Sequence, residues 1–343
     1  MAMIDRRQFL KRSALGLLIG GSVSSIGRAI QPSPEAVRRF VAETLVIDGV
    51  MQPRPMDGEW PKEPGAIKKL TGVDLAAMTL GEDSLDSVNR FLEHHSEVYL
   101  KVEKAEDIER ARREGRHGVL YYFQNQFDFE NDPERLNDWF SKGLRVFQPT
   151  YSEENELGGG SRADSVPLKP FGRAILTLCN QLGIVVDVSH CGRTTTLDVA
   201  RFTKEPITAN HVNAFALAAA SRNKDLDELK AIADTGGVVG VTAINTILRP
   251  SEDKKATLEN FVAQIDYLVE NIGIDHIGIA TDAYLDGHSQ DKRHECAPPL
   301  NTQTRWFHLV QRLIDRNYSK ASVEKLLGGN FRRVYEKVLP TGN

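Results

Sequence analysis

Eight short apolar runs recur along the chain, and sequence of helical character follows each of them. Because the runs are nearly continuous rather than alternating, they predict strands that are buried on both faces, as in a parallel sheet. Between the last two runs, residues 258–272 place apolar side chains at i, i+3, i+4 and i+7, which predicts an amphipathic helix. The runs occupy residues 45–48, 75–80, 119–124, 146–151, 184–190, 207–211, 238–243 and 277–282.

Strands that alternate with helices in this way predict an α/β fold, a single (β/α)8 TIM barrel with C-terminal helices over residues 302–339. An open doubly wound sheet is the alternative, but the sequence lacks the Gly-rich phosphate loop that usually accompanies it. We expect one barrel domain over residues 30–343. Within it, residues 52–72 are predicted to form a long loop over the barrel mouth, and Gly158-Gly159-Gly160 a flexible loop at its rim.

The N-terminus carries a twin-arginine pattern, Arg6-Arg7-Gln8-Phe9-Leu10-Lys11, followed by a short and mildly apolar segment. That segment is too short to span a bilayer comfortably as a permanent helix. It resembles the signals of the bacterial twin-arginine export route, so we expect residues 1–29 to be a signal peptide, the export machinery to be a partner, and the protein to be periplasmic. Gly27-Arg28-Ala29 is a poor cleavage site, which leaves membrane anchoring through an uncleaved signal open.

Composition narrows the range of partners. The net charge is −4 and the pI is about 6.2, which argues against nucleic acid as a partner. The three cysteines form no CxxC pair, so we expect free thiols rather than a zinc knuckle or a disulfide framework. The oligomeric state stays open, with a homodimer as one alternative.

Polar residues stand where the predicted strands end, and barrel enzymes carry their chemistry at this end. His190 and His211 end neighbouring strands, so their neutral imidazoles can converge on one metal ion. Asp282 could be a third ligand or the base for a water molecule. Imidazole-rich ligation favours Zn²⁺, with other divalent ions as alternatives. The competing interpretation is that each histidine only donates a hydrogen bond to a loop carbonyl.

Several motifs resemble the membrane (renal) dipeptidase family of metallopeptidases over residues 45–339, nearly the whole predicted domain. That resemblance implies an amidohydrolase-type barrel that cleaves dipeptides. The motifs are Ile184-Val185-Val186-Asp187-Val188-Ser189-His190, Ala209-Asn210-His211, Ser221-Arg222-Asn223, Gly278-Ile279-Ala280-Thr281-Asp282 and Gly328-Gly329-Asn330-Phe331-Arg332-Arg333-Val334.

The resemblance also implies roles for particular residues. His190 and His211 match the family's zinc ligands from the fifth and sixth strands. Asp282 matches the aspartate that handles the proton of the nucleophilic water. Arg222 matches the arginine that binds the substrate's carboxylate, for which a guanidinium fork is suited. Tyr151 stands where the family has a histidine or tyrosine that faces the substrate carbonyl.

The first strand and the third depart from the family pattern. Val50 and Gln52 replace a histidine and an aspartate ligand, and Gln124 replaces the glutamate that bridges two zinc ions. A neutral amide does not offset the repulsion between two dications as a carboxylate does. We therefore predict a mononuclear site at the two histidines, completed by Asp282 or by the Gln124 oxygen.

Two hypotheses follow. In the first, the protein is a metal-dependent hydrolase that cleaves a dipeptide or related amide with a metal-activated water. In the second, the barrel has lost hydrolysis and acts as a periplasmic binding protein or a repurposed tailoring enzyme.

Overall fold

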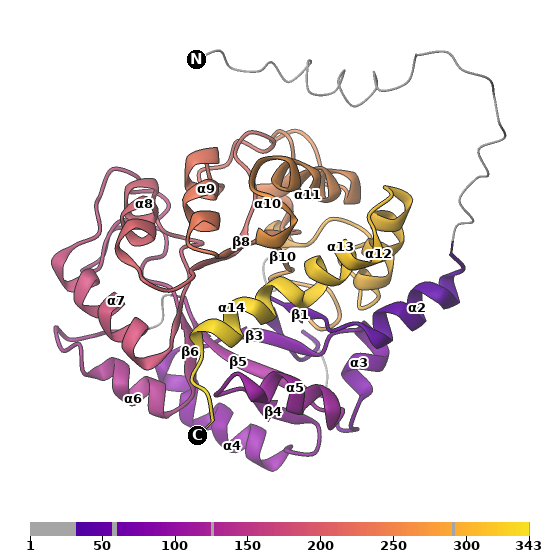
Figure 1. Ribbon diagram of the computed structural model, residues 1–343, viewed down its shortest axis with the longest axis horizontal. Helices are drawn as coiled ribbons and strands as arrows, with labels where there is room; N and C mark the ends of the chain where they lie inside the picture. The colour runs from indigo at the N-terminus through magenta and orange to yellow at the C-terminus, as the bar shows by residue number, and fades with distance from the viewer. Residues whose placement is uncertain (1–31, 57–59, 125–126, 290–291, 343) are drawn as a thin grey trace. The chain divides into compact units, whose positions relative to one another are not determined.

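A computed structural model describes residues 32–56, 60–124, 127–289 and 292–342. Within these residues, eight parallel strands form a barrel, which confirms the predicted fold (Figure 1). Each strand lies inside or overlaps one of the predicted runs. In chain order they are β1 (Ile47–Asp48), β3 (Leu75–Thr79), β5 (His117–Phe123), β6 (Leu144–Phe147), β7 (Val185–Val186), β8 (Thr208–Val212), β9 (Val238–Thr242) and β10 (Ile277–Ala280).

Two weaker joints complete the circle. Between β7 and β8, Asp187 and Thr208 form a parallel bridge, and the Val188 amide donates to the Thr208 carbonyl at 2.7 Å. Between β10 and β1, the Gly49 amide donates to the Ile279 carbonyl at 2.9 Å. His190 follows the first strand of one joint, and Asp282 follows the first strand of the other.

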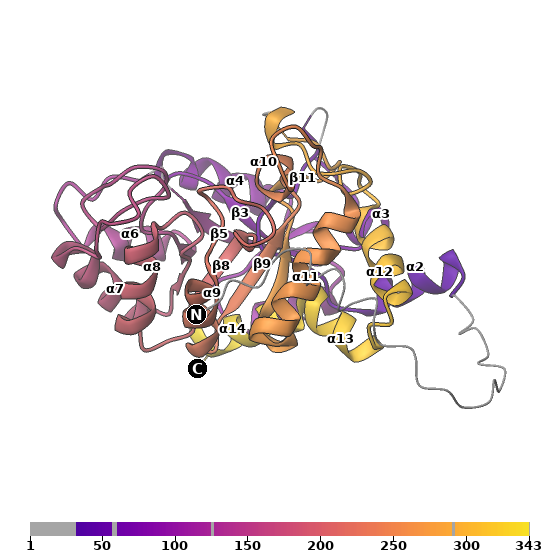
Figure 2. The same ribbon diagram turned by 90° about the horizontal axis from the view of Figure 1, so that it is seen from above.

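Helices surround the strands in both views (Figures 1 and 2). Among the described residues, no helix is long and apolar enough to cross a membrane. Three short strands lie outside the eight: β4 (Tyr99–Lys101) pairs with β5, and β2 (Met51–Gln52) pairs with β11 (Ala283–Tyr284). The α-helices are α2 (Pro34–Glu43), α3 (Ala66–Thr71), α4 (Leu85–His94), α5 (Glu106–Arg113), α6 (Arg135–Ser141), α7 (Pro170–Leu182), α8 (Arg193–Phe202), α9 (Leu226–Asp234), α10 (Asn245–Leu248), α11 (Leu258–Ile272), α12 (Arg305–Asp315), α13 (Lys320–Glu324) and α14 (Asn330–Val338).

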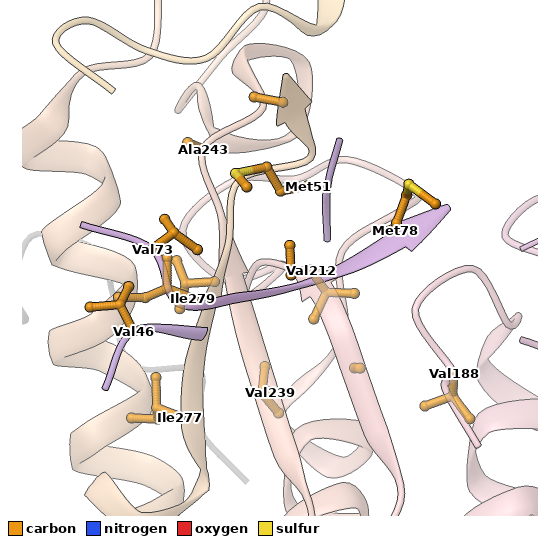
Figure 3. Close-up of a cluster of buried hydrophobic side chains, with 14 of the residues drawn as sticks. Val46, Met51, Val73, Met78, Val188, Val212, Val239, Ala243, Ile277 and Ile279 are labelled. Atoms are coloured by element: carbon orange, nitrogen blue, oxygen red, sulfur yellow. The ribbon is translucent and has the colours of Figure 1, made fainter. Parts of the chain in front are cut away.

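Successive strand residues belong to two different hydrophobic clusters. In β3, Leu75 and Ala77 belong to the smaller cluster, whereas Ala76 and Met78 belong to the larger one. Figure 3 shows part of the larger cluster, with Met78 among the labelled side chains. Because side chains alternate between the two faces of a strand and both faces are buried here, the sequence shows continuous apolar runs.

Phe331 of α14 inserts among the strands. Its ring is fully buried and packs so closely on Gly278 that a Cβ there would lie 2.4 Å from the ring; Gly49 and Gly240 also approach it. The neighbouring Asn330 donates to the carbonyls of Ile274 and Ile277, both at 2.7 Å, and so fixes α14 to the start of β10. This packing explains the Asn-Phe pair in the C-terminal motif.

Two loop predictions need correction. Residues 52–72 are not one loop, because Ala66–Thr71 form helix α3. The Gly158–Gly160 loop is packed rather than flexible: the Gly159 carbonyl accepts hydrogen bonds from the Gly192 amide and Thr150, and a Cβ on Gly160 would lie 2.4 Å from the Tyr151 carbonyl oxygen. The three cysteines are free thiols, as predicted. The predicted signal peptide lies outside the described residues.

Candidate active site

The two predicted histidines meet at the carboxyl ends of β7 and β8. His211 is the fourth residue of β8, and His190 lies in the turn that follows β7. Their Nε2 atoms are 3.1 Å apart, and both side chains are buried. Two imidazoles on one tetrahedral zinc, each with a Zn–N distance of about 2.0 Å, have nitrogen atoms about 3.3 Å apart. The pair therefore has the spacing of two ligands to a single ion.

Both imidazoles are neutral at ordinary pH. Burial lowers the pKa of His190 and of His211 well below the usual range, and the Arg222 guanidinium lowers each further. A neutral imidazole is the form that binds a metal. Neither Nδ1 atom has a hydrogen-bond partner among the described residues.

Two tyrosine rings enclose the pair. Tyr151, four residues after β6, stacks on His190 with ring centroids 3.9 Å apart and an angle of 17° between the planes. Tyr122 of β5 and His211 are in a T-shaped arrangement, with ring centroids 6.3 Å apart. Tyr151 is 38% exposed, so it lies between the buried histidine and solvent. Burial raises its pKa, and Asp282 raises it further, which keeps its hydroxyl protonated at neutral pH.

Asp187 joins the two histidine-bearing segments. Its carboxylate is fully buried and accepts hydrogen bonds from the Ser189 amide at 2.9 Å and the Tyr122 hydroxyl at 2.9 Å. On the β8 side, the Thr208 hydroxyl and the Asn210 amide donate to the same carboxylate. These four bonds fix the residues next to both histidines. Asp187 is a charged residue inside an apolar run, and this pattern is a signal for such a structural role. The sequence alone nevertheless led to no prediction for Asp187.

Two cations after β8 hold the backbone around His190. Arg222 donates to the carbonyls of Ser189 at 2.6 Å and His211 at 3.1 Å. Lys224 donates to the carbonyl of Cys191 and forms a buried ion pair of 3.2 Å with Glu228. The carbonyls on either side of His190 are therefore both bound by positive charges. Nothing in the sequence around Lys224 indicates that its side chain binds the backbone beside His190.

Asp282 lies at the joint between β10 and β1 and has a left-handed backbone, with φ of 53°. Its amide donates to the Val50 carbonyl at 2.7 Å. Burial raises the pKa of its carboxyl to about 7; Arg222 opposes the rise and Asp48 adds to it. Asp282 raises the pKa of Tyr151 and Arg222 lowers it, so these three predicted residues lie within electrostatic range of one another.

Gln124 and Gln52 turn toward the same threonine. The Gln124 side chain donates to the Thr79 hydroxyl at 2.8 Å, and the Gln52 side chain donates to the Thr79 carbonyl at 2.9 Å. Val50 is 2% exposed and belongs to the same hydrophobic cluster as Phe331. Thr79, which anchors both amides, was not among the residues that the sequence singled out.

Comparison with known proteins identifies the family. A family model described as membrane dipeptidase, peptidase family M19, matches residues 59–342. The chain belongs to the membrane dipeptidase family. It is therefore a metallohydrolase-family protein, and this family implies a divalent metal, typically zinc.

The chain is also similar to individual proteins and to a solved structure. The chain is 30% identical over 243 residues to an uncharacterized protein in the pqqA 5′ region of Klebsiella pneumoniae, covering 68% of this chain and 87% of that protein. It is 26% identical over 258 residues to the dipeptidase tcpJ of Claviceps purpurea, covering 74% of this chain and 59% of that protein. The crystal structure of an amidohydrolase from Pseudomonas aeruginosa is 28% identical, with a TM-score of 0.78 over 90% of this chain and 99% of that chain.

Proposed function

We propose that the protein hydrolyses a dipeptide or a related amide with one divalent ion, preferentially zinc, held by His190 and His211. The 3.1 Å separation of two buried imidazole nitrogens is the observation that carries this proposal. The family match and the relative named a dipeptidase support the substrate class.

The residues present fit one ion. Two neutral imidazoles supply two borderline ligands, and a catalytic zinc site needs about one more from the protein. Asp282 could supply it as an anion. The Gln124 oxygen is the alternative, because the nitrogen of that amide is already bonded to Thr79. When bound, the ion supplies Lewis acidity, which polarises a carbonyl and makes water a stronger acid.

The residues that replace the family's other metal ligands fit a single ion rather than two. Val50, Gln52 and Gln124 offer no imidazole and no carboxylate there, and both amide nitrogens donate to Thr79. Two dications held close together need an anionic ligand between them. We infer that the positions that would hold a first ion have become part of the packed wall.

Asp282 acts as the base in this proposal. In its ionised form it accepts the proton of the attacking water as the water oxygen bonds to the carbonyl carbon. The same proton then passes to the departing nitrogen as the C–N bond breaks. A carboxyl with a pKa of about 7 is suited to both steps near neutral pH.

Arg222 and Tyr151 position the substrate. A guanidinium has five N–H groups, and Arg222 uses one each for the carbonyls of Ser189 and His211. The remaining three can bind a substrate carboxylate. The protonated Tyr151 hydroxyl can donate a hydrogen bond to the carbonyl oxygen as negative charge develops on it.

The alternative is a dipeptidase-like barrel that binds or converts a ligand without hydrolysis. The neutral set Val50, Gln52 and Gln124 is the observation that favours it. A panel of dipeptides separates the two. The proposal requires turnover that His211→Ala abolishes while circular dichroism shows an intact fold. Failure of the metal-loaded wild type to hydrolyse any member, together with saturable binding of one of them, would favour the alternative.

The location of this chemistry is a separate proposal. The Arg6-Arg7 pattern supports export by the twin-arginine machinery to the periplasm, with or without cleavage of residues 1–29. Cell fractionation of wild type and of an Arg6→Lys/Arg7→Lys variant tests it. Equal amounts of both proteins in the periplasm would contradict this route.

A further inference from the structure

A cavity of about 640 Å³ lies at the end of the barrel opposite the histidines. His117, the first residue of β5, lines it, whereas Gln124 near the candidate active site follows the last residue of the same strand. Seven strand residues span about 20 Å. The cavity is therefore separate from the catalytic groups, and α2, α3 and α12 contribute to its walls (Figure 1).

The walls carry an excess of positive charge. Two of the cations are neutralised locally, since Lys68 pairs with Asp74 at 2.6 Å and Arg116 with Glu114 at 2.5 Å. The other four form no ion pair with any described carboxylate, and Glu35 is the second acidic residue of the lining. The six cations are Arg38, Arg39, Lys68, Lys69, Arg112 and Arg116.

The inner end offers hydrogen bonds that the fold leaves unused. His117 is 3% exposed, and apart from the backbone of Val73 no described group offers its ring nitrogens a hydrogen bond. Burial lowers its pKa to about 3, and the backbone of Val73 offsets this only partly, so the ring is neutral. A neutral imidazole has one donor and one acceptor, so at least one of the two is buried without a partner, which is costly.

Apolar groups form the rest of the surface. Ile67, Val73 and Val98 are buried beneath it, and Phe307 of α12 forms one wall, with the Arg38 guanidinium 4.6 Å from its ring centroid. A guanidinium held over an aromatic ring keeps its N–H edge available to a ligand.

We propose that this cavity binds an organic phosphate, with the phosphate at the cations that form no ion pair and the apolar part against Phe307. Guanidinium forks match phosphate oxygens in geometry and charge, and the volume is that of a small-molecule site. The phosphate could belong to a soluble ester or to the headgroup of an anionic phospholipid.

Two probes distinguish these sources on the purified full chain at about 0.15 M salt, where weak surface attraction is screened. Phenyl phosphate is titrated by calorimetry, and vesicles of phosphatidylcholine with and without phosphatidylglycerol are tested by flotation. Saturable binding of phenyl phosphate indicates a soluble ester, whereas capture only by phosphatidylglycerol vesicles indicates a headgroup. Binding of neither probe would overturn the proposal.

Two cavity variants and one control locate the site. Arg39→Glu/Lys69→Glu reverses two exposed cations of the lining, and Ala42→Trp fills the cavity without changing charge. Both should weaken binding about tenfold or more. Lys204→Glu/Lys230→Glu makes the same charge change at exposed residues outside the cavity and should leave binding within twofold. Unchanged binding in the charge-reversal variant, or equal loss in the control, would contradict the assignment.

Discussion

Thr281 donates two hydrogen bonds to Asp48, one from its amide at 2.8 Å and one from its hydroxyl at 2.7 Å. These bonds tie the end of β10 to the end of β1 next to Asp282. Two residues after Asp48, the Val50 carbonyl accepts a hydrogen bond from the Asp282 amide. The left-handed backbone that aims Asp282 is therefore fixed from the first strand, although neither Asp48 nor Thr281 has to touch a substrate.

Removing the Thr281 hydroxyl should weaken both the joint and the chemistry. Thr281→Val leaves one oxygen of the fully buried Asp48 carboxylate with one donor fewer, which costs about 1–3 kcal/mol. We expect a lower midpoint of urea unfolding and a lower kcat. Thr177→Val removes a hydroxyl that donates to Arg173 on the exposed surface of α7, so it serves as the control and should change neither. Equal stability of the two variants would show that the Asp48 bonds do not hold the joint.

Asp282 should impose an acidic limb on the pH–rate profile. Its ionised form is the base, and its pKa is raised to about 7 from the ordinary 3.8, so kcat/KM should fall as pH decreases through about 7. A bound cation would shift this limb to lower pH. Asp282→Asn should reduce kcat by about a hundredfold or more and abolish the limb, whereas the exposed Asp234→Asn should retain it. An acidic limb that persists in Asp282→Asn would assign the base to another group.

Tyr151 should contribute through its hydroxyl and its ring separately. Tyr151→Phe keeps the stack on His190 and removes the hydroxyl, so kcat should fall about tenfold to a hundredfold with unchanged metal content. Tyr151→Ala also uncovers His190, and metal should then dissociate faster. Stopped-flow metal transfer to a chelator and steady-state kinetics measure the two effects. Full activity of Tyr151→Phe would exclude the hydroxyl from catalysis.

Phe331 should be a major contributor to barrel stability. Truncation to alanine leaves a cavity against three glycines, which cannot supply side chains to fill it, and should cost about 3–5 kcal/mol. Phe215→Ala, at a residue that is 41% exposed, is the matched control and should cost less than about 1 kcal/mol. Urea unfolding measures both. Similar losses in the two variants would contradict the role given to Phe331.

The barrel could be predicted because its strands bury both faces, and this leaves continuous apolar runs in the sequence. The convergence of His190 and His211 could also be predicted, since neighbouring parallel strands end at the same edge. Helix α3 was missed because its segment is rich in residues typical of loops. The Asp187 network depends on contacts between β5, β8 and the segment after β7 that no local pattern encodes.

Contacts through backbone carbonyls were the least predictable part of the site. Arg222 was expected to bind a substrate carboxylate, and it also binds the carbonyls of Ser189 and His211. Every residue has a backbone carbonyl, so the sequence does not indicate which carbonyl accepts a hydrogen bond from a distant side chain. For the same reason, the hydrogen bond from Lys224 to the Cys191 carbonyl could not be predicted from the sequence.

The number of metal ions per chain tests the central claim most directly. We predict about one equivalent of zinc or another divalent ion by plasma mass spectrometry after purification without chelators, and less than about 0.2 equivalents in His190→Ala/His211→Ala. Exposed His308→Ala should match the wild type. Two equivalents in the wild type would contradict the single site, and a content that the double variant leaves unchanged would contradict ligation by these histidines.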